Sequence, residues 1–242
     1  MRIALISDLH GNEVALQAVF ADLGRVGVDQ LICLGDVATL GPRPNAVLAM
    51  LRERGCPCIL GNHDEFLLDP GLIRAYTEAP IVVESVDWCR AQLSPAELDF
   101  VATFQRGLRL DLGGGDALLL FHGSPLSHMQ DLLATTPPAE LDRLLGPHTA
   151  TVMACGHTHI QMLRQHRGML LVNPGSVGMP FREYVHGQVP RLMAHAEYAI
   201  LEAGPSGISV NLRRIPLDKR QLRDAAAASA IPLRPMLVAE YT

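Results

Sequence analysis

The sequence has no hydrophobic run long enough to cross a membrane and no excess of basic residues. No apolar stretch reaches the roughly 20 residues that a membrane-spanning helix needs. Charged residues make up 19% of the 242 residues and the formal net charge is −5, so a broad basic face for nucleic acid is not expected, although a local basic pocket is compatible with these numbers. The apolar run Ile3–Ile6 is too short for the core of a signal peptide. We therefore expect a cytoplasmic protein without membrane anchorage.

Cysteines are few, and their number and spacing exclude a disulfide framework. The five are Cys33, Cys56, Cys58, Cys89 and Cys155. The pair Cys56-Pro57-Cys58 could bind a metal, but no second pair completes a thiolate site. We expect ordinary buried or half-buried thiols.

Hydrophobic residues make up 48% of the chain, which is enough for a sizeable core. The first half alternates strand and helix patterns, and such repetition with short connections implies parallel strands. Asn12 is a candidate cap of the first helix, and Ser94-Pro95 begins a later one. Strands are predicted over Arg2–Ile6, Gln30–Leu34 and Pro57–Leu60, and helices after Asn12 and over Asn45–Glu53, Glu65–Arg74, Val86–Gln92 and Pro95–Phe104.

The second half is richer in strands. Glycine-containing turns separate paired apolar runs, which is typical of hairpins. A last helix is predicted over Asp218–Ala228, followed by an irregular end. No repeat or linker divides the chain, so residues 1–242 are expected to form one α/β domain. Strands are predicted over Leu108–Leu112, Ala117–Phe121, Thr151–Cys155, Gln161–Gln165, Met169–Val172, Glu197–Leu201 and Ile208–Ile215.

Carboxylate, amide and imidazole side chains follow the predicted strands at their carboxyl ends. In open α/β sheets, this edge is where ligands bind. One such residue alone is usually a helix cap or a turn residue, but a set in register with successive strand ends is hard to explain structurally. In an extended segment, residues two apart point to the same side, so the two pairs of spacing two can each address one cluster. The set comprises Asp8, His10, Asp36, Asn62, His63, His122, His157 and His159.

Oxygen and imidazole ligands without thiolate suit Mn, Fe, Zn, Ni or Co better than a structural zinc site. Leaving His63 aside, seven groups exceed what one tetrahedral ion requires. A carboxylate shared between two ions about 3.5–4 Å apart would explain the excess, and paired ions suit phosphoryl chemistry.

The ordered motifs resemble the calcineurin-like metallophosphoesterase family, and the trailing Asn173–Gly178 segment is similar to its small bacterial YfcE-type phosphodiesterases. The resemblance implies a four-layer α/β/β/α sandwich with two mixed sheets. The motifs are Asp8-Leu9-His10-Gly11-Asn12, Gly35-Asp36, Gly61-Asn62-His63-Asp64, His122-Gly123 and Gly156-His157-Thr158-His159.

The resemblance also implies the roles of these residues. Asp36 would bridge two ions, one held also by Asp8, His10 and His159, the other by Asn62, His122 and His157. His63 would bind no metal, contact the phosphate and protonate the leaving oxygen. Asn12, immediately after the first motif, would donate a hydrogen bond to the phosphate.

The sequence departs from the protein-phosphatase branch, which has an Asp-Arg-Gly run after the bridging aspartate. Here that stretch reads Val37–Pro44, so no second aspartate stands there to orient His63. Asp64 could supply some of this orientation. Arg43 in this loop is a candidate phosphate clamp or an exposed loop residue, and Arg182 is an even choice between substrate contact and surface.

Together the residues and the resemblance predict a binuclear phosphoesterase acting on phosphodiesters or phosphomonoesters of small molecules or nucleotides through a metal-activated hydroxide. Mn is the first choice of metal, and a homo-oligomer is possible. The alternative is a non-catalytic binding scaffold on the same fold, since fold alone does not decide function.

Overall fold

The computed structural model describes residues 1–185 and 188–242. Its first sheet has four strands in the order β2-β1-β8-β9. The pair β1–β2 is parallel, whereas β8 runs antiparallel to both β1 and β9, so the sheet is mixed. The strands are β1 (Arg2–Ile6), β2 (Gln30–Cys33), β8 (His195–Gly204) and β9 (Gly207–Pro216).

The second sheet has five strands in the order β3-β4-β5-β7-β6. The central strands β4, β5 and β7 are parallel, and the two edge strands are antiparallel to their neighbours. The strands are β3 (Leu108–Gly113), β4 (Asp116–Leu120), β5 (Val152–Ala154), β6 (Met162–His166) and β7 (Met169–Asn173).

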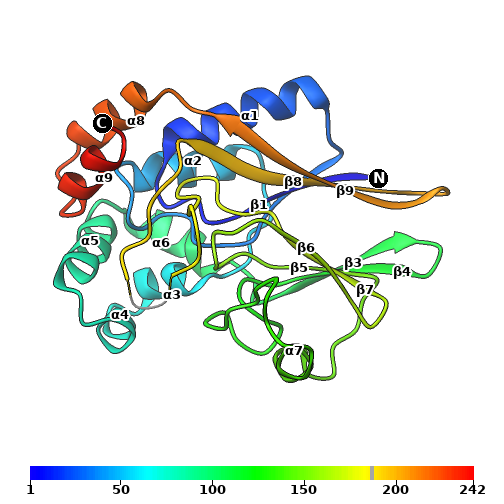
Figure 1. Cartoon of the computed structure of the whole chain (residues 1–242). Helices are drawn as coiled ribbons and strands as arrows, with labels where there is room; N and C mark the ends of the chain where they lie inside the picture. Colours follow the sequence, from blue (N-terminus) through cyan, green and yellow to red (C-terminus); the bar gives the residue numbers. More distant parts are fainter. Residues whose placement is uncertain (186–187) are drawn as a thin grey trace.

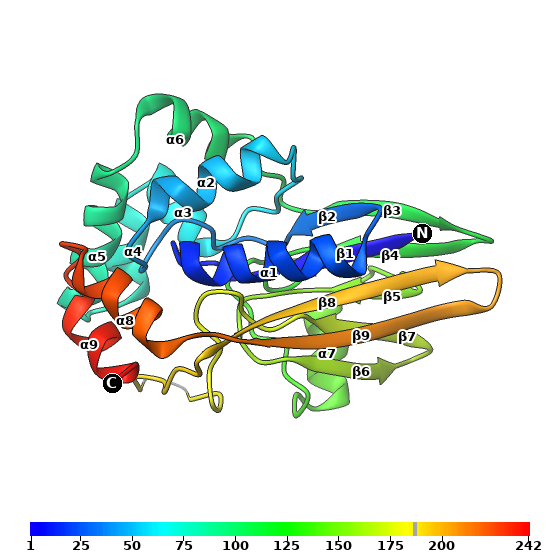
Figure 2. The same cartoon turned by 90° about the horizontal axis from the view of Figure 1, so that it is seen from above.

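Helices cover the outer faces of the two stacked sheets (Figure 1). α1 and α2 lie over the first sheet and α7 lies under the second. Seen from above, most of the remaining helices gather at the end to which β1 and β2 point (Figure 2). The helices are α1 (Glu13–Val26), α2 (Pro44–Glu53), α3 (Asn62–Leu68), α4 (Gly71–Tyr76), α5 (Pro80–Ala91), α6 (Pro95–Ala102), α7 (Pro138–Leu145), α8 (Lys219–Ala227) and α9 (Arg234–Glu240).

Successive side chains of a strand point to opposite faces of its sheet, so each strand packs against a different layer on each side. In β1, Ile3 and Leu5 pack between the sheets with Leu118 and Leu120 of β4. Ala4 and Ile6 belong to the cluster under α1. On the far side, Leu141 and Leu145 of α7 pack on the second sheet. The predicted α/β/β/α sandwich with two mixed sheets is confirmed.

Three helix predictions need correction. The helix predicted over Val86–Gln92 is α5, which begins earlier, at Pro80 in its first turn. The predicted Glu65–Arg74 helix is split into α3 and α4, with Asp69 in an extended conformation between them. Asp69 precedes Pro70, and a residue before proline is disfavoured in the helical region. The expected irregular end contains α9, which has Pro235 in its first turn, where proline is tolerated because it lacks an otherwise unpaired N–H.

The predicted strand Pro57–Leu60 is also wrong as a full strand. It forms single bridges only, Cys33 with Cys58 and Ile59 with Gln105. Its path still runs parallel to the end of β2, because the Cys33 N–H donates to Pro57 and the Ile59 N–H donates to Cys33. It therefore delivers Asn62 to the same edge as a strand would. Within the described part of the chain, no helix is long and apolar enough to cross a bilayer.

Candidate metal centre

The candidate ligands lie at one end of the two sheets, and all but Asn62 lie on a turn that follows a strand. Asp8 and Asp36 follow β1 and β2. His122 follows β4, and His157 and His159 follow β5. Asn62 and His63 form the first turn of α3. The sequence-predicted set is therefore brought together from five segments.

The backbone at these turns is left-handed at five of the candidate ligands. The φ angles are 53° at Asp8, 43° at His10, 56° at Asp36, 69° at His157 and 57° at His159. This corrects the expectation that the pairs of spacing two lie in extended segments. Left-handed conformations cost roughly 1–2 kcal/mol per residue for L-amino acids. Strain of this kind gathered at one site points to a functional requirement.

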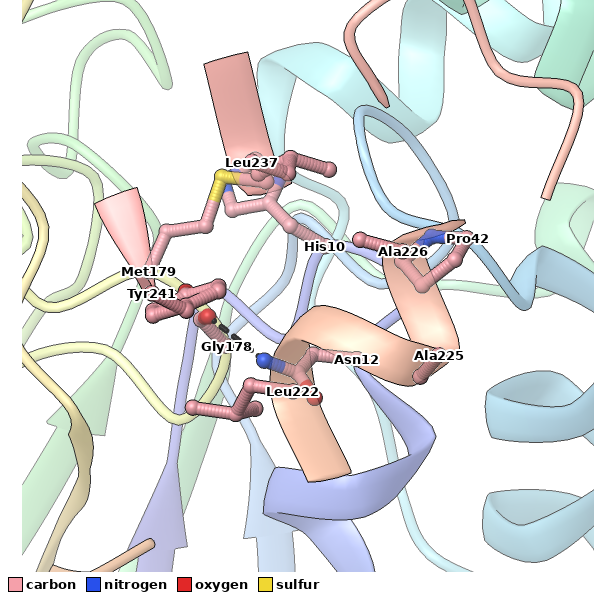
Figure 3. A pocket seen from close by; sticks show the side chains of 10 residues that line it. All are labelled: His10, Asn12, Pro42, Gly178, Met179, Leu222, Ala225, Ala226, Leu237 and Tyr241. Carbon is pink, nitrogen blue, oxygen red and sulfur yellow. Dashed lines mark hydrogen bonds between the residues drawn. The ribbon is translucent and has the colours of Figure 1, made fainter. Parts of the chain in front are cut away.

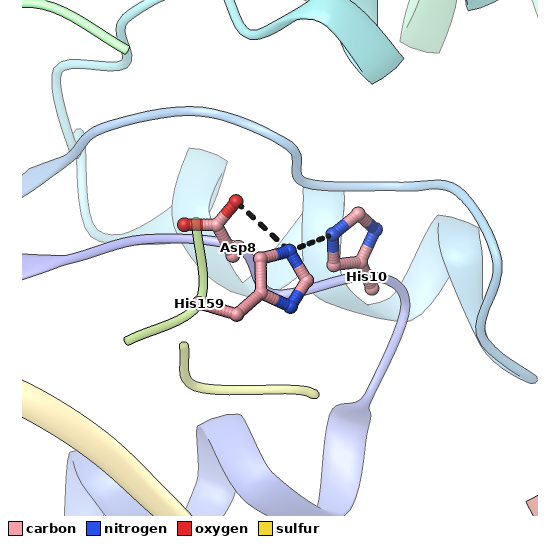
Figure 4. A group of neighbouring side chains, drawn as sticks. All are labelled: Asp8, His10 and His159. Atoms are coloured by element: carbon pink, nitrogen blue, oxygen red, sulfur yellow. Dashed lines mark hydrogen bonds and ion pairs between the residues drawn. The ribbon is translucent and has the colours of Figure 1, made fainter. Parts of the chain in front are cut away.

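The first group of ligands consists of Asp8, His10 and His159 (Figure 4). His159 Nε2 lies 3.3 Å from Asp8 Oδ1 and 3.1 Å from His10 Nε2. All three side chains are buried. Their donor atoms thus converge on one small volume.

The second group consists of Asp36, His122 and His157, with Asn62 beside them. Asn62 Oδ1 lies 3.2 Å from His122 Nε2 and 3.0 Å from His157 Nδ1. His157 and His159 therefore fall into different groups although only Thr158 separates them.

Asp36 lies between the groups. Its Oδ2 is 3.3 Å from His122 Nε2 and 3.8 Å from His10 Nε2. Its Oδ1 accepts the backbone N–H of His63 at 2.9 Å. One carboxylate thus faces imidazoles of both groups.

The donor set fits divalent transition-metal ions. His122 Nδ1 lies 2.7 Å from the Leu34 carbonyl and His159 Nδ1 lies 2.7 Å from the Met179 carbonyl. A carbonyl can only accept, so both Nδ1 atoms carry hydrogens and each neutral ring turns a lone pair on Nε2 toward the cluster. Such anchored imidazoles are typical of metal ligands.

The electrostatics of the cluster also favour a cation. Burial opposes ionisation of Asp36, but His122 and His63 outweigh it and hold the pKa of this carboxyl well below its ordinary value. Burial alone would lower the pKa of His122, yet the charge of Asp36 and the contact with it raise this pKa to about 10. The cluster as a whole therefore attracts positive charge.

His63 stands beside both groups without joining either. Its ring packs edge-on against His10, with centroids 5.2 Å apart, and against Phe66 and Tyr76 of α3 and α4. Its Nδ1 is buried without a hydrogen-bond partner. Burial, partly offset by the charge of Asp36, lowers the pKa of His63 to about 4.

Asp64 does not orient His63. Its carboxylate accepts the backbone N–H groups of Asp36, Val37 and Gly61 at 2.8–3.0 Å. It therefore ties the turn after β2 to the start of α3. Burial and the nearby charge of Asp36 raise its pKa to about 7.

The remaining phosphate candidates are placed as follows. Asn12 accepts the Ala15 N–H as the predicted cap of α1, and its amide donates to the Gly178 carbonyl at 2.9 Å. Arg43 is exposed and pairs with Glu13 at 3.3 Å. Arg182 is exposed, and its backbone N–H donates to the backbone carbonyl of Arg191. Phosphate contact by these side chains stays a prediction.

The other histidines and the cysteines lie outside the cluster. His128, His166 and His195 pair with Glu65, Asp142 and Glu197, His148 is exposed, and His186 falls outside the described residues. All five cysteines are buried free thiols, and none belongs to a metal-binding group in the described part of the chain.

Sequence reasoning missed residues that surround the cluster. Phe181 stacks on His159 with ring centroids 4.2 Å apart. Tyr76 packs beside His63, and Asp131 lies 3.3 Å from His157 Nε2. These residues come from loops and a short helix without a motif. Only the closeness of Phe181 to the Asn173–Gly178 motif could have drawn attention to it.

The C-terminal helices form a wall beside His10 (Figure 3). Leu222 and Ala226 of α8 face His10 and Asn12 across a small cavity, and Leu237 and Tyr241 complete the wall. The cavity volume is about 10 Å³, roughly that of one water. The His10 side of the cluster is thus closed by apolar side chains.

The model of the calcineurin-like phosphoesterase superfamily domain matches residues 1–202. The chain belongs to this superfamily. Membership in a superfamily of phosphoester hydrolases agrees with the two Asp/His groups, which are candidate sites for the divalent metals that its members typically bind. The match stops short of α8 and α9.

Three proteins illustrate what this chain is similar to in sequence and in structure. An uncharacterised protein of Methanocaldococcus jannaschii is 26% identical over 193 residues, which are 74% of this chain and 76% of that protein. A metallophosphoesterase from Sphaerobacter thermophilus has a TM-score of 0.76 at 25% identity, covering 100% of this chain and 98% of that one. A hypothetical protein from Pyrococcus horikoshii has a TM-score of 0.81 at 18% identity, covering 98% and 96%.

The phosphoesterase YfcE from E. coli shares the fold at greater distance. Its TM-score is 0.50 at 21% identity, covering 89% of this calcineurin-like phosphoesterase and all of YfcE. The resemblance to the family that the motifs predicted is confirmed by the family match. At 21% identity, the likeness to YfcE shows a shared fold and nothing more.

Proposed function

We propose that this chain is a binuclear metal-dependent phosphoesterase that hydrolyses phosphodiester or phosphomonoester bonds of small molecules or nucleotides. The observation that carries the proposal is the position of Asp36, whose Oδ2 faces His10 of one ligand group and His122 of the other. A carboxylate shared in this way is what two adjacent ions require. We further propose that residues 1–242 form one domain, since α8 lines a cavity with His10.

The ligands divide into two sets that share Asp36. Two divalent transition-metal ions, with Mn the first to test, would supply Lewis acidity to the phosphate oxygens and lower the pKa of water. One ion would be held by Asp8, His10, Asp36 and His159. The other would be held by Asp36, Asn62, His122 and His157.

His63 would move the proton. Burial keeps the ring neutral in the free protein, with a pKa of about 4, so it would act as an acid only once the negative charge of a bound phosphate raises that pKa. The imidazolium would then give its proton to the leaving oxygen as the bond to phosphorus breaks. The proton would come from Nε2, because Nδ1 is enclosed in protein. In the part of the chain that the structure describes, no carboxylate hydrogen-bonds this ring, so its position depends on packing against Phe66 and Tyr76.

Small phosphate esters are the substrate class favoured here. The stretch after Asp36 lacks the Asp-Arg-Gly run of protein phosphatases, and apolar side chains of α8 and α9 close the His10 side. Diesters and nucleotides are therefore tested before phosphoproteins.

The test begins with chelator-treated protein that is reloaded with Mn, Fe, Zn, Ni or Co. We expect two ions per chain by elemental analysis, together with hydrolysis in a panel of phosphomonoesters, diesters and nucleotides. A protein that binds no ion and hydrolyses none of the panel would contradict the proposal and favour the scaffold alternative.

Asp36→Asn is the sharpest single change. Because Asp36 faces both groups, metal content and turnover should fall together. Turnover should fall by more than about 100-fold, since loss of an outer partner alone costs 10–100-fold. Asp22→Asn is the control, because Asp22 is also buried but pairs with Arg213 and Tyr198. Full occupancy and near-normal rates in Asp36→Asn would exclude the two-ion assignment.

A further inference from the structure

The four candidate histidine ligands are not anchored alike. Three turn Nε2 to the cluster and hold Nδ1 against an uncharged oxygen. The anchors are Thr39 Oγ1 at 3.3 Å for His10, the Leu34 carbonyl at 2.7 Å for His122, and the Met179 carbonyl at 2.7 Å for His159.

His157 is turned the other way and has a charged anchor. Its Nδ1 faces the cluster, 3.0 Å from Asn62 Oδ1. Its Nε2 lies 3.3 Å from Asp131 Oδ1. A carboxylate that contacts one nitrogen of an imidazole fixes the orientation and the tautomer of the ring. It also makes the other ring nitrogen, which faces the metal, more basic and so a stronger metal ligand.

Asp131 is itself held in place. It lies in the connection between β4 and α7, where its side chain is 38% exposed. The hydroxyl of Tyr184, from the connection between β7 and β8, donates to Asp131 Oδ2. The two carboxylate oxygens thus have different partners, one the phenol and the other the imidazole.

The charges of the two ligand groups explain why a carboxylate is useful at this place. The first group can draw on two carboxylates, Asp8 and the shared Asp36. The second has only Asp36, because Asn62 is a neutral amide. Asp131, which contacts His157 on the side away from the cluster, brings a second negative charge to this second ligand group.

We propose that Asp131 is a positioning residue that strengthens divalent-metal binding at the His157 side of the centre, with Tyr184 holding its carboxylate. This inference rests on the proposed function, because it requires that the centre binds two ions. Asp131 acts through His157 and touches no reacting atom in this role.

The experiment measures metal binding directly. Chelator-treated wild type, Asp131→Ala, Asp131→Asn and Tyr184→Phe are titrated with Mn²⁺ by calorimetry and with Co²⁺ by its visible spectrum. In Asp131→Ala, one of the two affinities should fall about 10–100-fold and the other should stay. Asp131→Asn should lose less, because its amide oxygen can still face His157 Nε2 at the place of Asp131 Oδ1, although without the negative charge. Tyr184→Phe should weaken the same site.

The matched control is Asp142→Asn. Asp142 is also a partly exposed carboxylate paired with a histidine, 2.7 Å from His166 Nε2, and neither residue belongs to a ligand group. Its loss should leave both affinities and the Co²⁺ spectrum unchanged. Thermal unfolding of each metal-free variant separates positioning from folding, since a merely structural role would lower the melting temperature without selective loss of one ion.

The outcomes distinguish this inference from the proposed function. Wild type with two ions and Asp131→Ala with two unchanged affinities would overturn the role of Asp131 alone. Equal weakening at both sites would also overturn it. A wild type that binds no divalent ion would overturn both proposals.

Discussion

At the scale of single residues, His63 is the motif histidine whose role is tested without disturbing the ligands. Its ring packs edge-on against His10, and no carboxylate among the described residues hydrogen-bonds that ring. A general acid helps most when the leaving group is basic, because a nitrophenolate departs unprotonated and an alkoxide does not. Its contribution therefore depends on the leaving group, whereas phosphate positioning affects all substrates alike.

We expect His63→Asn to keep both metals and to lose more rate on alkyl or nucleoside esters than on nitrophenyl esters. The loss on poor leaving groups should approach the upper part of the about 10²–10⁴-fold range of general acid catalysis. The measurement is kcat/KM across leaving groups with metal content checked. His166→Asn, which removes a histidine outside the ligand groups, should change neither. Equal losses for all leaving groups would make His63 a binding residue only.

At the scale of elements, the turn that starts α3 presses closely on Asp36. A Cβ on Gly61 would lie 2.1 Å from Asp36 Oδ1 and 2.6 Å from its backbone nitrogen. The backbone of Gly61 is extended, with φ −86° and ψ 171°, and alanine adopts this conformation without strain. Position 61 therefore requires glycine because a side chain would clash with Asp36, and not because of its backbone conformation.

Gly61→Ala should therefore displace the Asp36 carboxylate and lower both metal content and melting temperature. Gly24→Ala in α1 is the control, because nothing lies within 4 Å of its Cβ position. That change should keep the metals and stabilise the helix by about 0.5–1 kcal/mol. Elemental analysis and thermal unfolding test both variants, and normal metal content in Gly61→Ala would refute the steric argument.

Local signals explain what the sequence could predict at this scale. Strand ends marked by Asp8, Asp36 and His122 follow from alternation and turn residues, which are properties of neighbouring positions. Pro70 separates α3 from α4, because the residue before a proline is disfavoured in the helical region. The helical spacing of the apolar residues on both sides led to the prediction of one continuous helix. Asp131 and Phe181 carry no such signal, since they reach His157 and His159 only after distant segments have packed. Their roles required the tertiary structure.

At the scale of the whole molecule, the buried histidines should make stability depend on pH in the absence of metal. His122 has its pKa raised to about 10, so its stabilisation is complete below the unfolded value near 6.5 and is lost as the pH rises toward 10. Burial lowers the pKa of His10 to about 3 and that of His63 to about 4. Below pH 6.5, His10 and His63 are protonated in the unfolded chain but stay neutral in the folded chain, so the free energy of unfolding decreases again as the pH falls.

We expect the free energy of unfolding of chelator-treated protein to peak near neutral pH and to decline on both sides. Denaturant unfolding between about pH 5 and pH 9 measures it. Saturating Mn²⁺ should raise stability throughout, by about 2.7 kcal/mol at 100 times its dissociation constant. It should also remove the alkaline decline, because a ligated His122 has no titrating proton on Nε2 and keeps only the Nδ1 hydrogen that faces Leu34. A flat profile without metal would contradict the electrostatic picture of the cluster.

The apolar wall beside His10 bears on how the protein is handled. Tyr241 lines that wall, so an affinity tag fused directly after α9 would begin near the side of the cluster that His10 occupies. An oligohistidine tag there would offer competing imidazoles to the same ions and would push on α9. The N-terminus lies at the opposite end of the molecule (Figure 1), where the amino group of Met1 donates to the Ala203 carbonyl. Purification handles and surface-immobilisation linkers therefore belong on Met1.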